Sequence, residues 1–171
     1  SSDLKVTDDA GNASDDPAGA GAYSVVYDAS PPSIGSLTGP DSAKNVPVVL
    51  EYTGITDDTG EVASVDLWVK APGDAWTDSG VTNTAAPSGS LSFSSYSSDG
   101  QYAFGLVAED DAGNTSNPPT GDGLFQMTYD ATAPEAGTLT GPDAPDAGSI
   151  TFSYDGVSDA TSGVKTVSLW V

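Results

Sequence analysis

Acidic and amide side chains in loops are the groups of this sequence that could do chemistry. The chain carries 25 Asp and Glu residues against only 4 basic residues, and its formal net charge is −21. Calcium binds six to eight oxygens, at about 2.3–2.6 Å, from carboxylates, amides, backbone carbonyls and water. We therefore predict a Ca²⁺ protein, whose candidate ligands are Asp28, Asp57, Asp58, Glu61, Asp110, Asp111, Asn114, Asp130 and Asp159.

High salt or simple turn formation could also account for the acidic residues. A protein adapted to high salt spreads carboxylates over every surface, whereas a calcium protein gathers them in loops. Within residues 31–132 only Glu51, Asp66 and Glu109 fall on clearly predicted strands, which favours calcium, although a calcium protein can also be adapted to high salt. The stretch Asp-Ala-Gly-Asn also shapes a turn without any metal, because Gly and Asn tolerate positive φ and Asp accepts local backbone N–H groups.

The composition excludes several function classes. With no Cys and no His there is no thiol nucleophile, no disulfide and no imidazole for a catalytic triad or a zinc site. No basic patch exists to bind nucleic acid, and an anionic membrane surface would repel the chain. Paired carboxylates can hydrolyse glycosides, but a small sandwich domain offers no deep pocket, so we predict a protein that is not an enzyme and does not insert into a membrane.

A long internal repeat organises the chain. Asp8–Asn12 recurs as Asp110–Asn114, an offset of 110 − 8 = 102 residues that continues without a gap to the last residue. A period of this length predicts tandem copies of one domain. The predicted division is into three parts: the end of a preceding repeat (1–29), a complete repeat (30–132) and the first part of the next one (133–171).

The elements that must position the acidic loops are β-strands. No segment has helical periodicity, and Gly and Pro separate short runs with alternating apolar residues, which predicts an all-β sandwich. We expect seven strands in the complete repeat, with a polar loop at 81–88. The expected strands are 33–38, 47–53, 62–70, a short strand carrying Trp76, a strand with Leu91 and Phe93, 101–109, and a strand with Phe125, Met127 and Tyr129.

The order of short motifs resembles that of bacterial immunoglobulin-like repeats, which occur in tandem in long surface and secreted proteins. The matching pieces are Ser162–Val164 with Val167–Trp170, Trp76–Thr77, Asp99–Tyr102, Asp111–Asn114, and Tyr129 to Pro134. One departure is Gly60-Glu61-Val62 in the complete repeat, where the next repeat has Ser162-Gly163-Val164. The resemblance implies tandem seven-stranded immunoglobulin or fibronectin type III-like Greek-key sandwiches, an extracellular or cell-surface location, and a structural role as a stalk, adhesin shaft or filament.

Strand direction predicts where the acidic residues meet. In such a sandwich the loop at 54–61 and the loop at 110–122 share the end at which the chain enters, next to Asp28. Several carboxylates at one end repel one another unless a cation lies among them. We therefore predict a calcium site at the junction between repeats, which would stiffen the array.

Two tryptophans support an alternative function. Trp68 is predicted to point outward, either packing on Trp76 or offering a surface to a glycan, a host or cell-surface protein, or a neighbouring copy of the chain. The alternative is thus a glycan- or protein-binding module, adhesive or accessory to an enzyme. Filaments built by strand donation between chains are a further option, although a continuous array is simpler. Sequons at Asn12 and Asn114 are interpreted as by-products of the repeat.

Overall fold

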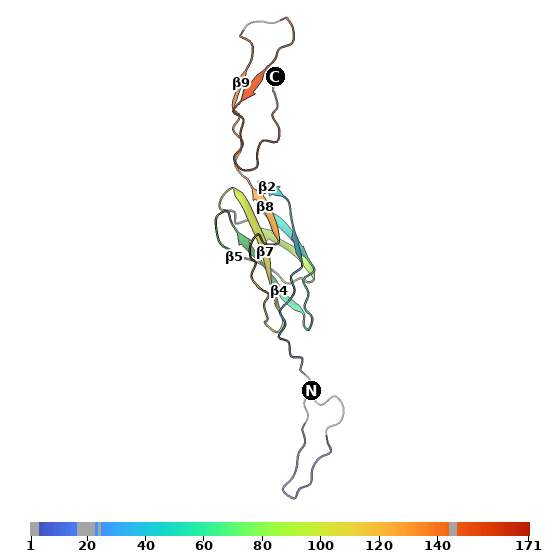
Figure 1. Ribbon diagram of the computed structural model, residues 1–171. Coiled ribbons are helices and arrows are strands. Elements are labelled where there is room, and N and C mark those ends of the chain that lie inside the picture. Colours follow the sequence, from blue (N-terminus) through green and yellow to red (C-terminus); the bar gives the residue numbers. More distant parts are fainter. Residues whose placement is uncertain (1–3, 17–22, 24, 144–146) are drawn as a thin grey trace.

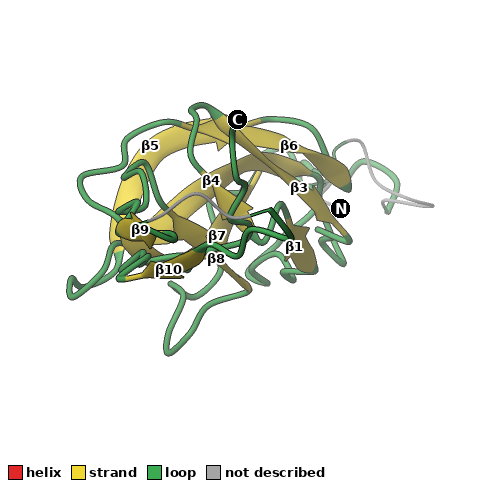
Figure 2. Cartoon of the chain, turned by 90° about the horizontal axis from the view of Figure 1, so that it is seen from above, coloured by secondary structure: helices red, strands yellow, loops and turns green. Residues whose placement is uncertain are grey.

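The protein is all-β throughout the part of the chain that the structure describes. The computed structural model describes residues 4–16, 23, 25–143 and 147–171, and Figure 2 shows only strands and loops there. No helix among these residues is long and apolar enough to cross a membrane. The strands are β1 (Ser36–Thr38), β2 (Ser42–Ala43), β3 (Val48–Thr53), β4 (Val62–Lys70), β5 (Thr77–Asn83), β6 (Ser88–Phe93), β7 (Gly100–Asp110), β8 (Phe125–Tyr129), β9 (Thr138–Thr140) and β10 (Ser153–Asp155).

Two open sheets make up the central part of the molecule (Figure 1). One contains three antiparallel strands in the order β1-β3-β6, and the other contains five in the order β2-β8-β7-β4-β5. Among the strand pairs of the described residues, only β2–β8 is parallel; β2 follows β1 in the chain but lies at the edge of the other sheet. The pair β9–β10 forms a separate two-stranded sheet.

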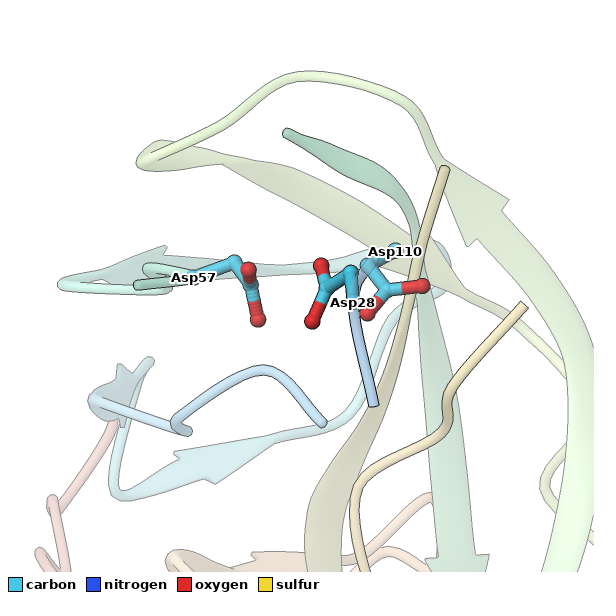
Figure 3. Close-up of side chains that lie close together, drawn as sticks. All are labelled: Asp28, Asp57 and Asp110. Carbon is cyan, nitrogen blue, oxygen red and sulfur yellow. The ribbon is translucent and has the colours of Figure 1, made fainter. Parts of the chain in front are cut away.

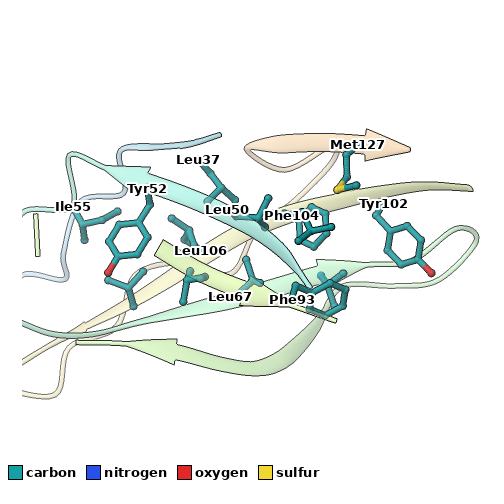
Figure 4. Close-up of a cluster of buried hydrophobic side chains, with 14 of the residues drawn as sticks. Leu37, Leu50, Tyr52, Ile55, Leu67, Phe93, Tyr102, Phe104, Leu106 and Met127 are labelled. Carbon is teal, nitrogen blue, oxygen red and sulfur yellow. The ribbon is translucent and has the colours of Figure 1, made fainter. Parts of the chain in front are cut away.

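The core lies between the two sheets and follows the alternation of the strands. Every second residue of β3 is buried, from Val48 to Tyr52, and the same holds for β4 from Val65 to Val69. In β7, Phe104 has no exposed surface and forms an edge-on aromatic pair with Phe93 of the opposite sheet. Figure 4 shows these apolar side chains from both sheets meeting in one cluster. The predicted all-β sandwich-like architecture is confirmed at this level.

Four details of the strand prediction were wrong. The first predicted strand, 33–38, is shortened to β1, and the extra strand β2 follows Gly39-Pro40. Trp76 precedes β5 and does not lie on a strand, and the predicted loop 81–88 is only four residues long, at 84–87. The error at β5 has a physical reason: it is an edge strand with no fully buried residue, so a polar sequence serves it as well as an apolar one.

The backbone arrangement repeats with the sequence. The pair Ser33–Thr56 recurs as Glu135–Ser158, with the same two N–H to C=O hydrogen bonds of 2.8 and 3.2 Å. The register of β9 on β10 likewise repeats that of β1 on the end of β3, 102 residues later. We call the linker residue Asp28 with the loop 54–61 the entrance to residues 30–132, and Asp130 with the loop 156–163 the entrance to residues 133–171. The linker and the loop of the two entrances can be compared residue by residue, whereas the turn at residues 110–114 has no second copy after residue 133 of this sequence.

Candidate functional site

The acidic turn Asp110–Asn114 is closed by its own hydrogen bonds. Asp110 Oδ1 accepts the backbone N–H groups of Ala112 (2.9 Å) and Asn114 (2.8 Å), while Oδ2 accepts the Asn114 side-chain amide (2.9 Å). Gly113 takes a φ of 87°, which disfavours other residues. These bonds link residues within five positions, so the local sequence is sufficient to form the turn.

The earlier copy of this turn, Asp8–Asn12, has the same geometry. Asp8 Oδ1 accepts the N–H groups of Ala10 (3.0 Å) and Asn12 (2.8 Å), and Oδ2 accepts the Asn12 amide (2.9 Å). The two copies differ in burial, since Asp8 is exposed whereas only 1% of Asp110 is exposed. Both copies therefore form the same turn from local hydrogen bonds, with Asp110 buried and Asp8 exposed.

Asp110 remains an anion in its buried position. Burial is the largest single influence on its pKa and raises it, but the hydrogen bonds from the Asn114 side chain and from the N–H groups of Asn114, Ala112 and Gly113 together outweigh burial and hold the pKa below the ordinary value. The site thus contains at least one carboxylate stabilised in its charged form.

Three carboxylates from distant segments lie together at the entrance to residues 30–132. Asp28 comes from the linker before β1, Asp57 from the loop between β3 and β4, and Asp110 from the end of β7, and their ligand atoms lie within 4.8 Å of one another (Figure 3). In the described part of the chain this is the group of acidic residues whose spacing suits a metal ion. We call it the Asp28–Asp57–Asp110 triad.

Each member of the triad is held by backbone groups. Asp57 Oδ1 accepts the N–H groups of Thr59 (2.9 Å) and Gly60 (2.8 Å), and Asp28 Oδ1 accepts the N–H of Ser30 (3.0 Å). The Asn114 side-chain amide, which also bonds Asp110, donates to the backbone carbonyl of Asp28 (3.4 Å). The linker is therefore bonded to the turn at residues 110–114 even without a ligand.

Two oxygens of the triad have no hydrogen-bond partner. Asp28 Oδ2 and Asp57 Oδ2 are fully buried, and neither accepts a hydrogen bond from the protein. A buried carboxylate oxygen without a partner costs free energy, because it has lost its water and gained nothing in exchange. A divalent cation bound between these oxygens would remove that cost, and the donor set, which is entirely oxygen, suits calcium better than a softer metal.

The other predicted ligands lie outside the triad. Asp58, Glu61 and Asp111 are exposed, and the backbone carbonyl of Glu61 accepts the N–H of Asp111 (3.0 Å). Asn114 acts through its amide N–H₂ as a donor that positions the carboxylates. The same bonds occupy the nitrogen that a glycan on the Asn114 sequon would need.

The remaining pair, Asp130 and Asp159, lies at the entrance to residues 133–171. Asp159 Oδ1 accepts the N–H groups of Thr161 (3.1 Å), Ser162 (2.8 Å) and Gly163 (2.8 Å). Asp130 Oδ2 accepts the N–H (3.1 Å) and the hydroxyl of Ser162. The two carboxylates are thus connected through Ser162, a residue that its position in the sequence did not mark as part of a site.

Trp76 packs against the outer face of the five-stranded sheet. A Cβ at Gly123 would lie 2.6 Å from its ring, and one at Gly105 would lie 3.6 Å from it and 2.4 Å from Pro119. Trp68 lies opposite Gly105 in the β4–β7 pairing, and the Trp76 ring lies on the same side of Gly105, so the packing of Trp68 on Trp76 stays a prediction. Both tryptophans are half-buried, which reduces the ring surface available to a glycan.

Gly105→Ala is expected to destabilise the protein by about 1–3 kcal/mol, the usual effect of overpacking. The added methyl would overlap Pro119, which lies against the β7 backbone beside Trp76. Denaturant unfolding followed by tryptophan fluorescence measures the change. An unaltered midpoint would show that the segment carrying Pro119 does not pack on β7 as described.

Asp99, just before β7, holds the linker at residues 130–134, which follows β8, to the central sheets. Its Oδ1 accepts the N–H of Ala131 (2.9 Å), and its Oδ2 accepts the hydroxyl of Thr132. The N–H of Ala131 is the largest influence on the pKa of Asp99; with the Thr132 hydroxyl it lowers this pKa from the usual 3.8, against the opposing effect of burial. Because the folded-state pKa is the lower one, Asp99 stabilises the fold fully above pH 3.8, and this contribution is lost as the pH falls through the folded-state value.

Asp99→Ala is expected to lower the melting temperature by a few degrees at neutral pH and to leave it unchanged at pH 2. Melting curves recorded in chelator between pH 7 and pH 2 test this, with the exposed Asp58 replaced by Ala as the control. A destabilisation equally large at both ends of the pH range would contradict the assigned role.

Comparisons of the chain with protein-family models, with curated proteins and with solved structures found no match. A function for this chain is therefore inferred from its own geometry.

Proposed function

We propose that the protein is a non-enzymatic array of immunoglobulin-like domains, serving as a stalk, adhesin shaft or filament outside the cell, and that Ca²⁺ stiffens its domain junctions. Support for the fold comes from strand order and from Tyr102. Its hydroxyl donates to the carbonyl of Ser98 (3.0 Å) and accepts the N–H of Ser97 (3.0 Å), as in the tyrosine corner of such sandwiches.

The observation that carries the calcium proposal is the pair of buried, unpartnered oxygens, Asp28 Oδ2 and Asp57 Oδ2. Asp28 belongs to the linker, whereas Asp57 and Asp110 belong to the sandwich. A cation coordinated by all three would therefore restrict the angle between the linker and the domain. The remaining coordination positions of Ca²⁺ would be filled by water and backbone carbonyls.

Removal of the metal provides the test. Chelator is expected to lower the melting temperature of the sandwich, and added Ca²⁺ to restore it, because a ligand that binds only the folded state stabilises that state. Small-angle scattering should show a broader distribution of end-to-end distances in chelator than in Ca²⁺. Mg²⁺ at the same concentration is the control for ionic strength. If neither the melting temperature nor the scattering responds to Ca²⁺, the calcium proposal is wrong.

A further inference from the structure

In the part of the loop next to the carboxylates (residues 57–61 and 159–163), the entrances to residues 30–132 and 133–171 differ at three positions: Asp58, Gly60 and Glu61 correspond to Ala160, Ser162 and Gly163. Gly60 of the first entrance corresponds to Ser162 of the second, since 162 − 60 = 102. Much of the surrounding hydrogen bonding repeats as well. Asp57 and Asp159 each accept the N–H groups two and three residues later, to which Asp159 adds that of Gly163, and Asp28 and Asp130 each accept the N–H two residues later. Of the three differences, the change from Gly60 to Ser162 is the one that adds a side-chain donor beside the linker carboxylate.

At the first entrance, Gly60 offers Asp28 no side-chain donor. Its N–H donates to Asp57 Oδ1, and Asp28 Oδ2 is left buried and unpartnered. A Cβ built on Gly60 would lie only 3.1 Å from Asp28 Oδ2 and 3.7 Å from Asp57 Oδ1. A side chain at position 60 would consequently stand directly beside the oxygen that lacks a partner.

At the second entrance, Ser162 is that side chain. Its hydroxyl and its N–H both donate to Asp130 Oδ2, and the N–H of Thr132 (3.1 Å) donates to Asp130 Oδ1. Asp130 is buried, with 8% exposure, yet both its oxygens have partners. Hydrogen bonds to a carboxylate are charge-assisted and stronger than bonds between neutral groups. Ser162 thus gives Asp130 Oδ2 the partner that Asp28 Oδ2 lacks and that a cation would supply there.

We propose that the residue at this repeat position decides whether a junction depends on metal. With Gly60, the linker carboxylate has an oxygen left for a divalent cation, and Ca²⁺ would add to the Asn114 bond that already joins the linker to the turn at residues 110–114. With Ser162, the hydroxyl takes the place of the cation, and the linker is joined to the next repeat without metal. The proposal rests on the proposed calcium function for the first junction and extends it by assigning the second junction to a metal-independent class.

Hydrogen exchange on the intact chain, compared in Ca²⁺ and in chelator, tests the difference directly. Amides at 57–60 and 112–114 should exchange at least tenfold more slowly in Ca²⁺, whereas those at 159–163 should exchange at the same rate in both conditions. An equal calcium response in both regions would overturn the proposal.

The substitution Gly60→Ser separates this inference from the calcium proposal itself, with Gly60→Ala as the matched control that adds the Cβ without the hydroxyl. Isothermal titration with CaCl₂ should show at least tenfold weaker binding to Gly60→Ser than to Gly60→Ala. In chelator, Gly60→Ser should melt at a higher temperature than Gly60→Ala. If Gly60→Ser binds Ca²⁺ as tightly as Gly60→Ala, the inference fails and the calcium function stands.

If neither the natural chain nor the variants bind Ca²⁺, the calcium function fails. The proposed bond from the serine hydroxyl to the linker carboxylate is then tested only by the melting temperatures of Gly60→Ser and Gly60→Ala in chelator. Should Gly60→Ser not fold, the reverse change, Ser162→Gly, gives the same information: it should speed amide exchange at 159–163 about tenfold in chelator. Unchanged exchange in that variant would show that the serine does not close the second junction.

Discussion

Asp57→Asn is expected to change the stability of the protein in opposite directions with and without calcium. In chelator the variant should melt at or above the temperature of the natural chain, because Asn keeps an oxygen for the N–H groups of Thr59 and Gly60 and removes one charge from the triad. In Ca²⁺ it should melt lower, because a ligand oxygen of a charged group is lost. When the Ca²⁺ concentration is about 100 times the dissociation constant, binding stabilises the natural chain by about 2.7 kcal/mol. The variant loses this stabilisation.

The control for this experiment is Asp58→Asn, which removes the same charge one residue away, from an exposed side chain outside the triad. It should leave both the calcium response and the melting temperature in chelator nearly unchanged. Differential scanning calorimetry across a calcium titration measures both variants. If Asp57→Asn and Asp58→Asn behave equally, Ca²⁺ stabilises the protein by reducing its overall negative charge and does not occupy the triad.

Phe104→Ala is expected to cost about 3–5 kcal/mol of unfolding free energy, the usual range for removing a large core aromatic. Phe104 lies at the centre of β7 with no exposed surface, and its ring meets Phe93 edge-on with 5.5 Å between centroids. The substitution leaves a cavity where the two sheets touch. For a domain of this size such a loss approaches the whole stability, since domains unfold with about 5–15 kcal/mol.

Chemical denaturation at 25 °C measures the effect of Phe104→Ala, and Val49→Ala on β3 is the matched control. Val49 alternates with the buried residues of its strand and is 49% exposed. Its truncation should change the free energy by less than about 0.5 kcal/mol. A loss for Phe104→Ala no larger than that of the control would show that the two sheets do not share the core described above.

A strand could be predicted from the sequence where its position depends on residues close together in the chain, and could not where it depends on the rest of the sheet. Alternating apolar residues predicted a strand at 47–53, and the structure has β3 there, with Val48, Leu50 and Tyr52 of that alternation buried. β5 was misjudged because an edge strand needs no apolar face, and β2 was missed because two residues carry too little pattern to show that the chain changes sheets.

The acidic residues also divide into what the local sequence predicts and what only the tertiary structure decides. Nine oxygen-bearing ligands were proposed from loop position, and the tertiary structure gathers three of them within reach of one ion. Asp58 and Asp111 are neighbours of triad members in sequence but point to solvent. Sequence position alone could not separate Asp57 from Asp58, because which of two adjacent side chains turns inward is decided by the N–H groups of Thr59 and Gly60.

By itself, then, the sequence determined the 102-residue repeat, the strand faces and the Asp110–Asn114 turn, because each of these depends on residues that are close together along the chain or on direct comparison of its two copies. Only the tertiary structure decided which carboxylates meet and which of their oxygens remain without a partner. The physical reason is that an unsatisfied buried oxygen is a property of a packed environment, made here by a linker, a loop and a strand end that lie far apart in the sequence.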